Sequence, residues 1–159
     1  MSDLDKAASS QAFEGSMFLY DKPALLTKED HGGLGLSQPD RPYDFVRDVK
    51  GLPIVTSEVQ TAQKFYPVIF SDIDNPVLLA IVGIIDDVNL FVDDDGKWDR
   101  GGYVPSYVRC HPFALASRGE GEYAVMIDES SPEISKDPQI PFFDGEDMNE
   151  AIQSRLDLC

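Results

Sequence analysis

The sequence predicts a single α+β domain in which an antiparallel sheet of about five to seven strands carries a few short helices. Short β-rich runs alternate with clusters of Gly, Pro, Asn and Asp, which is typical of antiparallel hairpins. Helical spacing or a helix-start signal occurs near residues 57–66, 105–110 and 146–157. A hydrophobic share of 42% over 159 residues is typical of one folded core.

The N-terminal part predicts little regular structure. Residues 1–15 are small and polar, so we expect a mobile lead-in to a single domain spanning residues 16–159. The apolar run from Met17 to Tyr20 predicts an edge strand that ends before Pro23. Closely spaced glycines then predict a loop at residues 32–35.

A strand followed by a helix is predicted in the middle of the chain. The β-rich run at residues 52–55 predicts the strand. Ser57 and Gln60 have the spacing of a capping box, which satisfies the free amides at a helix start. Pro67 then ends the helix, because proline cannot continue its hydrogen bonds.

The next segment predicts a three-stranded antiparallel meander. Its strands are expected at residues 68–71, 77–85 and 88–92, with turns rich in Asp and Asn between them. The run at residues 77–85 is apolar on both faces, so we place it at the centre of the sheet.

The second half of the chain predicts a helical turn, a hairpin and a final helix. Pro105 suits the first residue of a short helix that ends before Pro112. The glycine turn at residues 118–121 separates two β-rich runs and predicts a hairpin. The final helix starts near Glu146 and has one apolar face, formed by Met148, Ile152 and Leu156.

The charge balance restricts the class of partner. The net charge is −16, and the second half of the chain is the more acidic. Such a field disfavours nucleic acid and anionic membrane surfaces, and it favours solubility or a basic partner. The favoured interpretation of the charge is a solvated acidic surface, and the alternative is an unknown protein partner with a basic surface.

The cysteines and the hydropathy pattern indicate a compartment. Cys110 and Cys159 form no framework of paired spacings, so a native disulfide is not expected and a reducing environment fits better. The N-terminus has acids where a signal peptide has basic residues. The longest apolar run, at residues 77–85, is much shorter than the roughly 20 residues of a membrane span. We expect a cytoplasmic protein, with secretion by a non-classical route left open.

The stretch from Asn89 to Phe113 is the most distinctive part of the chain. It reads Leu-Phe-Val-Asp-x-Asp-Gly-x-Trp over residues 90–98 and Tyr-Val-Pro-x-Tyr-Val-Arg-x-x-Pro-Phe over residues 103–113. With these motifs the chain resembles the SapC family of bacterial proteins. Positions that match the family include His31, Gly96, Pro105 and Pro112. The resemblance implies an association with surface-layer biogenesis or secretion, and it implies no established reaction.

Aromatic and basic side chains of this stretch form a candidate partner-binding set. Its members are Trp98, Arg100, Tyr103, Tyr107, Arg109 and Phe113. Rings beside arginines are typical anchors of protein interfaces. For the rings themselves the favoured interpretation is a hydrophobic seam between the short helix and the sheet, because a core of this size needs its bulky residues. The leading hypothesis is a soluble, acidic protein-interaction domain without a cofactor, and an enzyme is the less favoured class.

Carboxylates near the turns form a candidate calcium site. They are Asp86, Asp87, Asp93, Asp95 and Asp99. An EF-hand is excluded, because with Gly96 at the sixth loop position the twelfth would be Gly102, where a carboxylate is required. A calcium-responsive structural module is one alternative function. The competing interpretation is a turn whose Asp side chains bind the backbone, with Gly96 at positive φ.

A metal-dependent enzyme or accessory component that uses His31 and nearby carboxylates is the other alternative. The motifs give it little support. Ser106 and His111 would lie about 140° apart around a helix, and no Gly-x-Ser-x-Gly elbow is present. The two histidines and two cysteines have no paired metal-ligand spacing. A histidine in a loop more commonly caps a turn.

Overall fold

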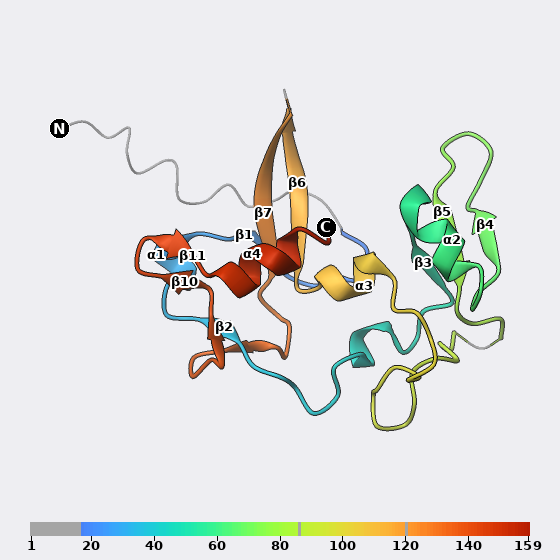
Figure 1. Cartoon of the computed structure of the whole chain (residues 1–159), viewed down its shortest axis with the longest axis horizontal. Coiled ribbons are helices and arrows are strands. Elements are labelled where there is room, and N and C mark those ends of the chain that lie inside the picture. The colour runs from blue at the N-terminus through green and yellow to red at the C-terminus, as the bar shows by residue number, and fades with distance from the viewer. Residues whose placement is uncertain (1–16, 86, 120) are drawn as a thin grey trace.

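The computed structural model describes residues 17–85, 87–119 and 121–159 (Figure 1). The predicted lead-in at residues 1–15 lies outside this part. The helices are α1 (Lys28–His31), α2 (Val59–Ala62), α3 (Ser106–Cys110) and α4 (Glu150–Leu156), with 3-10 turns η1 (Asp44–Val46) and η2 (Thr56–Glu58). The strands are β1 (Pro23–Leu25), β2 (Gly35–Leu36), β3 (Gly51–Pro53), β4 (Val68–Phe70), β5 (Leu78–Ile81), β6 (Phe113–Gly119), β7 (Glu122–Asp128), β8 (Ile134–Ser135), β9 (Ile140–Pro141), β10 (Phe143–Asp144) and β11 (Asp147–Met148).

The α+β class is confirmed, but the described strands form four small antiparallel sheets instead of one. Their orders are β1-β7-β6, β3-β5-β4, β8-β2-β9 and β10-β11. Most strands have two to four residues, so each sheet covers only a small core. The extra strands come mainly from residues 134–148, where the Pro- and Ser-rich composition of residues 129–144 predicts a loop and the final helix is predicted to begin near Glu146.

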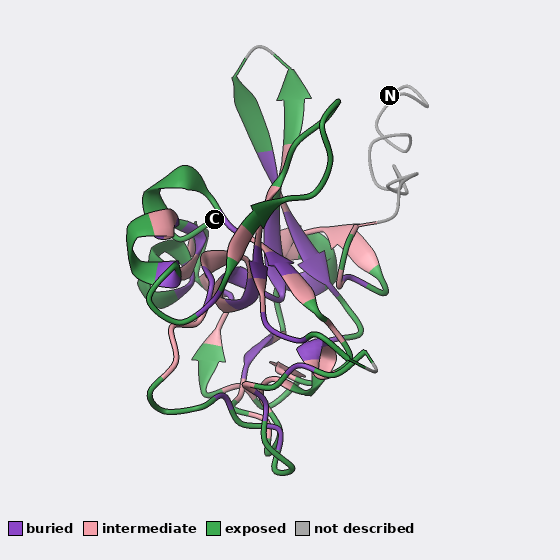
Figure 2. Cartoon of the chain, turned by 90° about the vertical axis from the view of Figure 1, so that its right-hand side faces the viewer, coloured by how far each residue is buried: buried purple, intermediate pink, exposed green. Residues whose placement is uncertain are grey.

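The hairpin predicted around residues 118–121 is confirmed and forms the longest strand pair. β6 and β7 pair with Phe113 opposite Ile127, and β1 adds to the other side of β7. Gly119 and Gly121 have φ of 90° and 82° beside the tip, which is the conformation that only glycine adopts readily. The base of the hairpin is buried, and the described residues at its far end, 117–119 and 121–123, are exposed (Figure 2).

Residues 51–90 form a second unit, which we call the sheet lobe. It contains β3, α2, β4 and β5 and lies at the right of Figure 1. β5 is the central strand, as its two apolar faces predict. The predicted strand at residues 88–92 is wrong, and β3 takes its place beside β5. The chain turns there because the buried Asn89 side chain donates to the Val46 carbonyl at 3.2 Å and accepts from the Phe91 amide at 3.0 Å.

Two further predictions in the first half of the chain need correction. The run at residues 17–20 is a turn closed by a Met17–Tyr20 bridge, and the first strand begins at Pro23 instead of ending there. The helix near residues 57–66 is not capped by Ser57 and Gln60; its capping side chain is Glu58, which accepts from the Val55 amide at 3.0 Å.

The final helix begins at Glu150, later than predicted. Asn149 caps it by accepting from the Ala151 amide at 2.9 Å, and the preceding residues form the β10–β11 hairpin. The helix predicted at residues 105–110 is confirmed, with Pro105 directly before its first residue. The predicted loop at residues 32–35 contains the start of β2. Gly35 is required there, because a Cβ would overlap the Ile140 carbonyl oxygen.

The buried side chains form three clusters. The largest lies under the sheet lobe and includes Leu52, Tyr66, Ala80 and Trp98. The second joins the hairpin to α4 and includes Phe113, Ile127, Phe142, Ile152 and Leu156. The third contains Tyr20, Ala114 and Met126. α3 contributes to more than one cluster, since Val108 belongs to the first and Tyr107 packs against the third, so this short helix connects the two halves of the molecule.

Candidate functional site

The structure distributes the candidate partner-binding set among different clusters. Trp98 is 7% exposed and packs between Tyr43 and Phe91, with ring centroids at 5.7 and 6.2 Å. Phe113 is fully buried and packs against Phe142 in another cluster. The side chains of Trp98 and Phe113 are therefore core side chains, and they do not lie together on a surface.

The remaining members are partly or fully accessible. Tyr107 is half-buried, and its hydroxyl donates to the Phe18 carbonyl at 2.6 Å. Arg109 is half-buried, lies 5.6 Å from the centroid of the Tyr103 ring, and donates to the Val104 carbonyl. Arg100 is exposed. Of the set, Arg100 is the side chain most available to a partner.

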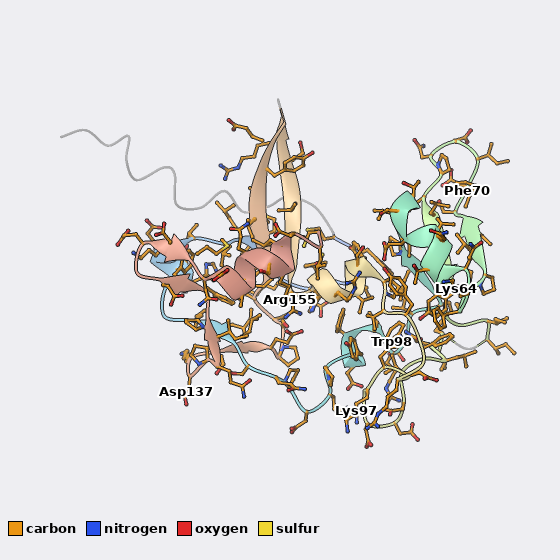
Figure 3. All side chains as sticks on the ribbon, viewed as in Figure 1. Lys64, Phe70, Lys97, Trp98, Asp137 and Arg155 are labelled. Atoms are coloured by element: carbon orange, nitrogen blue, oxygen red, sulfur yellow. The ribbon has the colours of Figure 1, made fainter. Side chains whose placement is uncertain are left out.

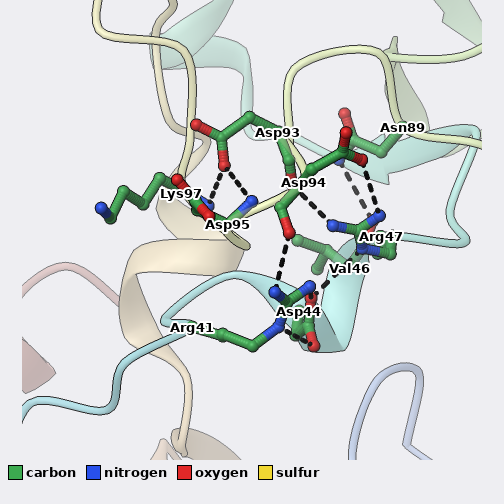
Figure 4. A network of polar contacts seen from close by, with 9 residues as sticks. All are labelled: Arg41, Asp44, Val46, Arg47, Asn89, Asp93, Asp94, Asp95 and Lys97. Atoms are coloured by element: carbon green, nitrogen blue, oxygen red, sulfur yellow. Dashed lines mark hydrogen bonds and ion pairs between the residues drawn. The ribbon is translucent and has the colours of Figure 1, made fainter.

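The acidic turn at residues 93–97 is held by its own backbone and by two arginines (Figure 4). The Asp93 carboxylate accepts from the Asp95 and Lys97 amides at 3.0 and 2.8 Å. Gly96 has φ of 69°, which allows the tight turn. Figure 4 also shows Arg41 and Arg47 directed at the turn; they donate to the Asp94 and Asp93 carbonyls at 2.7 and 2.6 Å.

The other calcium candidates lie apart from this turn. Asp87 pairs with Lys50 at 2.7 Å, and Asp99 accepts from the Gly101 amide at 2.7 Å. Asp86 lies outside the described residues. Within the described part of the chain, no group of three or more His, Cys, Asp or Glu side chains has the geometry to hold a metal ion. The Asp93 and Asp99 carboxylates therefore stabilise their own turns by accepting hydrogen bonds from backbone amides.

His31 lies at the end of α1 and lines a cavity of about 310 Å³ with Lys22, Glu129 and Lys136. Its Nδ1 is 3.2 Å from the Thr27 amide, and its Nε2 is 3.3 Å from a Glu129 oxygen. Both ring nitrogens therefore have protein partners. The arrangement ties α1 to the end of β7, and a substrate proton would have to compete with these contacts.

Glu58 is a buried carboxylate that connects the sheet lobe to α3. Its oxygens accept from the Ser106 amide and hydroxyl at 2.7 and 2.8 Å, and from the Tyr103 hydroxyl at 2.8 Å. Burial alone would raise the pKa of Glu58, but these donors and the Val55 amide lower it below its ordinary value. The group is an ionised anchor in the folded protein.

His111 is a second buried titratable group. Its ring stacks on Phe45 with centroids 4.0 Å apart, and its Nε2 lies 3.5 Å from an Asp128 oxygen. Neither ring nitrogen forms a hydrogen bond. Burial lowers the pKa of His111 to about 4, so the ring is neutral at pH 7. Asp128 instead accepts from the Asp21, Lys22 and Ser130 amides.

The exposed large apolar side chains of the described chain are concentrated in the sheet lobe. Ten of the fifteen large apolar side chains that are exposed in the described chain fall between residues 55 and 90. We call these residues the apolar lobe surface. They are Val55, Phe65, Ile69, Phe70, Ile73, Val77, Ile84, Ile85, Val88 and Leu90. Figure 3 shows Phe70 and Lys64 on this lobe, away from Arg155 beside α4.

The sequence does not reveal the two buried titratable side chains described above. Glu58 and His111 had no recognisable motif, and their roles depend on partners 48 and 17 residues away. The apolar lobe surface does have a signal in the sequence, but the pattern favours burial. The apolar run at residues 77–85 predicted complete burial, yet Ile84 and Ile85 are 76% and 69% exposed.

The comparisons with known proteins agree with the resemblance in the motif region. A family model described as SapC matches residues 26–159. No curated protein and no solved structure matches the chain. In the described residues, no helix has the length and apolar character that crossing a membrane requires.

Proposed function

The chain belongs to the SapC family, and from that premise we propose that it is an acidic protein-interaction domain whose binding surface is the apolar lobe surface. One observation carries the proposal: most of the large exposed apolar side chains of the described chain gather on one lobe. Monomeric proteins rarely expose large contiguous apolar patches, and such surfaces mark binding sites.

The edge of the lobe sheet supports this proposal. β4 is an edge strand that pairs with β5 in the described chain. The Ser71 amide donates to the Val77 carbonyl, and the Pro67 carbonyl accepts from the Ile81 amide. The backbone N–H and C=O groups of every second residue along β4 therefore point toward β5. The backbone groups of Val68 and Phe70 therefore point outward. An exposed edge with apolar side chains favours the addition of an extended segment from a partner.

Charge indicates the chemistry of the partner. Two exposed acids, Asp72 and Asp74, follow directly after β4, and the whole chain carries a net charge of −16. A second copy would bring the same charge to the interface and would be repelled. An extended segment with apolar side chains and flanking Lys or Arg residues fits both properties of the surface.

The motif residues have a supporting role in this proposal. Trp98 packs in the cluster beneath the lobe, and Glu58 fixes the lobe to α3. Arg100 is exposed and remains a candidate contact. We place this interaction in surface-layer biogenesis or secretion, which is the setting that the family resemblance implies.

Site-specific photo-cross-linking in the native cell tests the proposal. A photoreactive residue replaces Phe70, and the matched control replaces Tyr123 on the hairpin; the two side chains are 65% and 64% exposed. We expect a discrete cross-linked protein from position 70 and none from position 123. Equal patterns from both positions, or no product from position 70, would contradict the proposal.

A further inference from the structure

The two cysteines line one cavity, although 48 residues separate them in the sequence. The cavity has a volume of about 330 Å³ and lies between α3, β3, β6 and the turn after α4. Its lining includes Cys110, Cys159, Phe113 and Leu115. Cys110 is the last residue of α3 and is 4% exposed, whereas Cys159 is exposed and neither thiol forms a disulfide. Figure 1 shows the end of α4 near α3 and β6.

The position of Cys159 is fixed by backbone contacts. The Leu158 and Cys159 amides donate to the Arg155 and Leu156 carbonyls at 3.1 and 2.9 Å, which continues the chain as a turn after α4. Arg155 also donates to the Arg109 carbonyl at 3.1 Å and to the His111 carbonyl. The turn that carries Cys159 is thereby tied to the end of α3, which carries Cys110.

The surroundings of the two thiols differ. The neighbouring Cys110 side chain and the positive charge of Arg155 lower the pKa of Cys159, although its own burial acts to raise it. The Cys159 side chain and burial raise the pKa of Cys110. The exposed thiol therefore ionises more readily than the buried one. An accessible thiolate beside a buried partner is the arrangement that thiol–disulfide exchange requires.

We propose that Cys110 and Cys159 form a dithiol site that low-molecular-weight disulfides oxidise to an intramolecular disulfide. The Cys159 thiolate attacks one sulfur of the small disulfide, which breaks that bond and releases one small thiolate. Cys110 then loses its proton to solvent and attacks the Cys159 sulfur, releasing the second small thiolate. Both electrons of the protein dithiol pass to the small disulfide, and the protein loses two hydrogen atoms.

The second step has a specific electrostatic basis. Once Cys159 is bound in the mixed disulfide, its sulfur has no negative charge and no longer holds the Cys110 proton. Burial still raises the pKa of Cys110, and the charges of Arg109 and Arg155 act to lower it, so its thiolate forms more readily than it does beside a charged Cys159. The disulfide links the end of α3 to the turn after α4 and closes one wall of the cavity.

Oxidised glutathione is the probe that tests this site. The reduced chain is incubated with it, quenched with acid and analysed by mass spectrometry. We expect loss of two hydrogen atoms and a linked pair of peptides that contain Cys110 and Cys159. We expect Cys110→Ser to stop at a glutathione adduct on Cys159, and Cys159→Ser to gain no adduct in the same time.

Alkylation of the wild-type chain keeps the proposal testable if a variant fails to fold. In the native state we expect Cys159 to react with iodoacetamide about tenfold faster than Cys110, and we expect the difference to vanish in denaturant. Equal native rates, or oxidation that yields only disulfide-linked dimers, would overturn the proposal. Failure of this test leaves the proposed binding surface unaffected, because the two features share no side chain other than those at the cavity rim, Val55 and Val77.

Discussion

Glu58 and Ser106 are joined by two hydrogen bonds, from the Ser106 amide at 2.7 Å and from its hydroxyl at 2.8 Å. This contact links the sheet lobe to α3, which itself contacts the other half of the core. The carboxylate also holds the Tyr103 hydroxyl. Together with the packing of Val108 in the same cluster, this buried carboxylate positions the lobe that carries the proposed binding surface.

Replacing Glu58 with Gln is expected to destabilise the protein. The amide has one oxygen in place of two and turns an NH₂ group toward existing donors. Leaving buried donors without an acceptor costs about 2 kcal/mol of unfolding free energy. Urea denaturation measures the effect, with the exposed Glu122→Gln as the matched control. Equal stability of the two variants would show that the Glu58 contacts are not needed.

His111 is expected to make the protein less stable in mild acid. Its pKa is about 4 in the folded state against 6.5 for the free side chain, so the unfolded chain binds the extra proton between these values. The contribution of His111 to the free energy of unfolding is fully present above about pH 6.5. As the pH drops toward 4, the free energy of unfolding falls by about 3 kcal/mol. Chemical denaturation across this pH range measures the loss.

A His111→Gln variant is the control for this pH dependence. The charged groups that act on the ring are Asp128, Arg155 and Asp21, and they remain in the variant. The slope of stability between pH 4 and 6.5 is therefore expected to flatten. An unchanged slope would assign the acid sensitivity to the carboxylates instead.

Trp98→Ala is expected to weaken the whole lobe. The ring is buried between Tyr43 and Phe91, and removing such an aromatic side chain costs about 3–5 kcal/mol. The expected result is a lower urea midpoint together with weaker partner binding. A variant that keeps wild-type stability but loses binding would instead place Trp98 in direct contact with the partner.

The sequence could predict the elements that depend on local chemistry. The hairpin around residues 118–121 follows from its glycines, and α3 follows from Pro105 and Pro112. The prediction of a strand at residues 88–92 is wrong because the Asn89 side chain donates a hydrogen bond to the Val46 carbonyl, 43 residues earlier in the chain. The apolar composition of residues 77–85 predicts a buried segment. Composition does not show which side chains of the segment are left uncovered by the rest of the fold.

In the candidate sites too, features set by neighbouring residues are predictable, and features set by contacts between distant segments are not. Gly96 and Asp93 adopt the turn conformation that their residue types favour. The proximity of Cys110 and Cys159, and the anchoring by Glu58, depend on how distant segments pack. No local spacing in the sequence encodes these relationships.

Calcium is expected to leave the protein unchanged. The Asp93 carboxylate already accepts hydrogen bonds from two backbone amides, and the Asp99 carboxylate accepts one. Binding a cation would break these hydrogen bonds and disrupt both turns. Thermal melting with and without about 1 mM calcium measures this, since ligand binding to the folded state raises Tm. A rise of several degrees would support a calcium-responsive module.

The most direct test of the proposed binding surface compares partner capture by three forms of the full chain. The partner is the protein recovered by cross-linking, and the variants are Phe70→Asp and the equally exposed control Tyr123→Asp. Both substitutions replace exposed side chains, so similar melting temperatures are expected. The proposal predicts that Phe70→Asp reduces affinity at least about tenfold while Tyr123→Asp binds as the wild type. Wild-type affinity in a folded Phe70→Asp variant would contradict it.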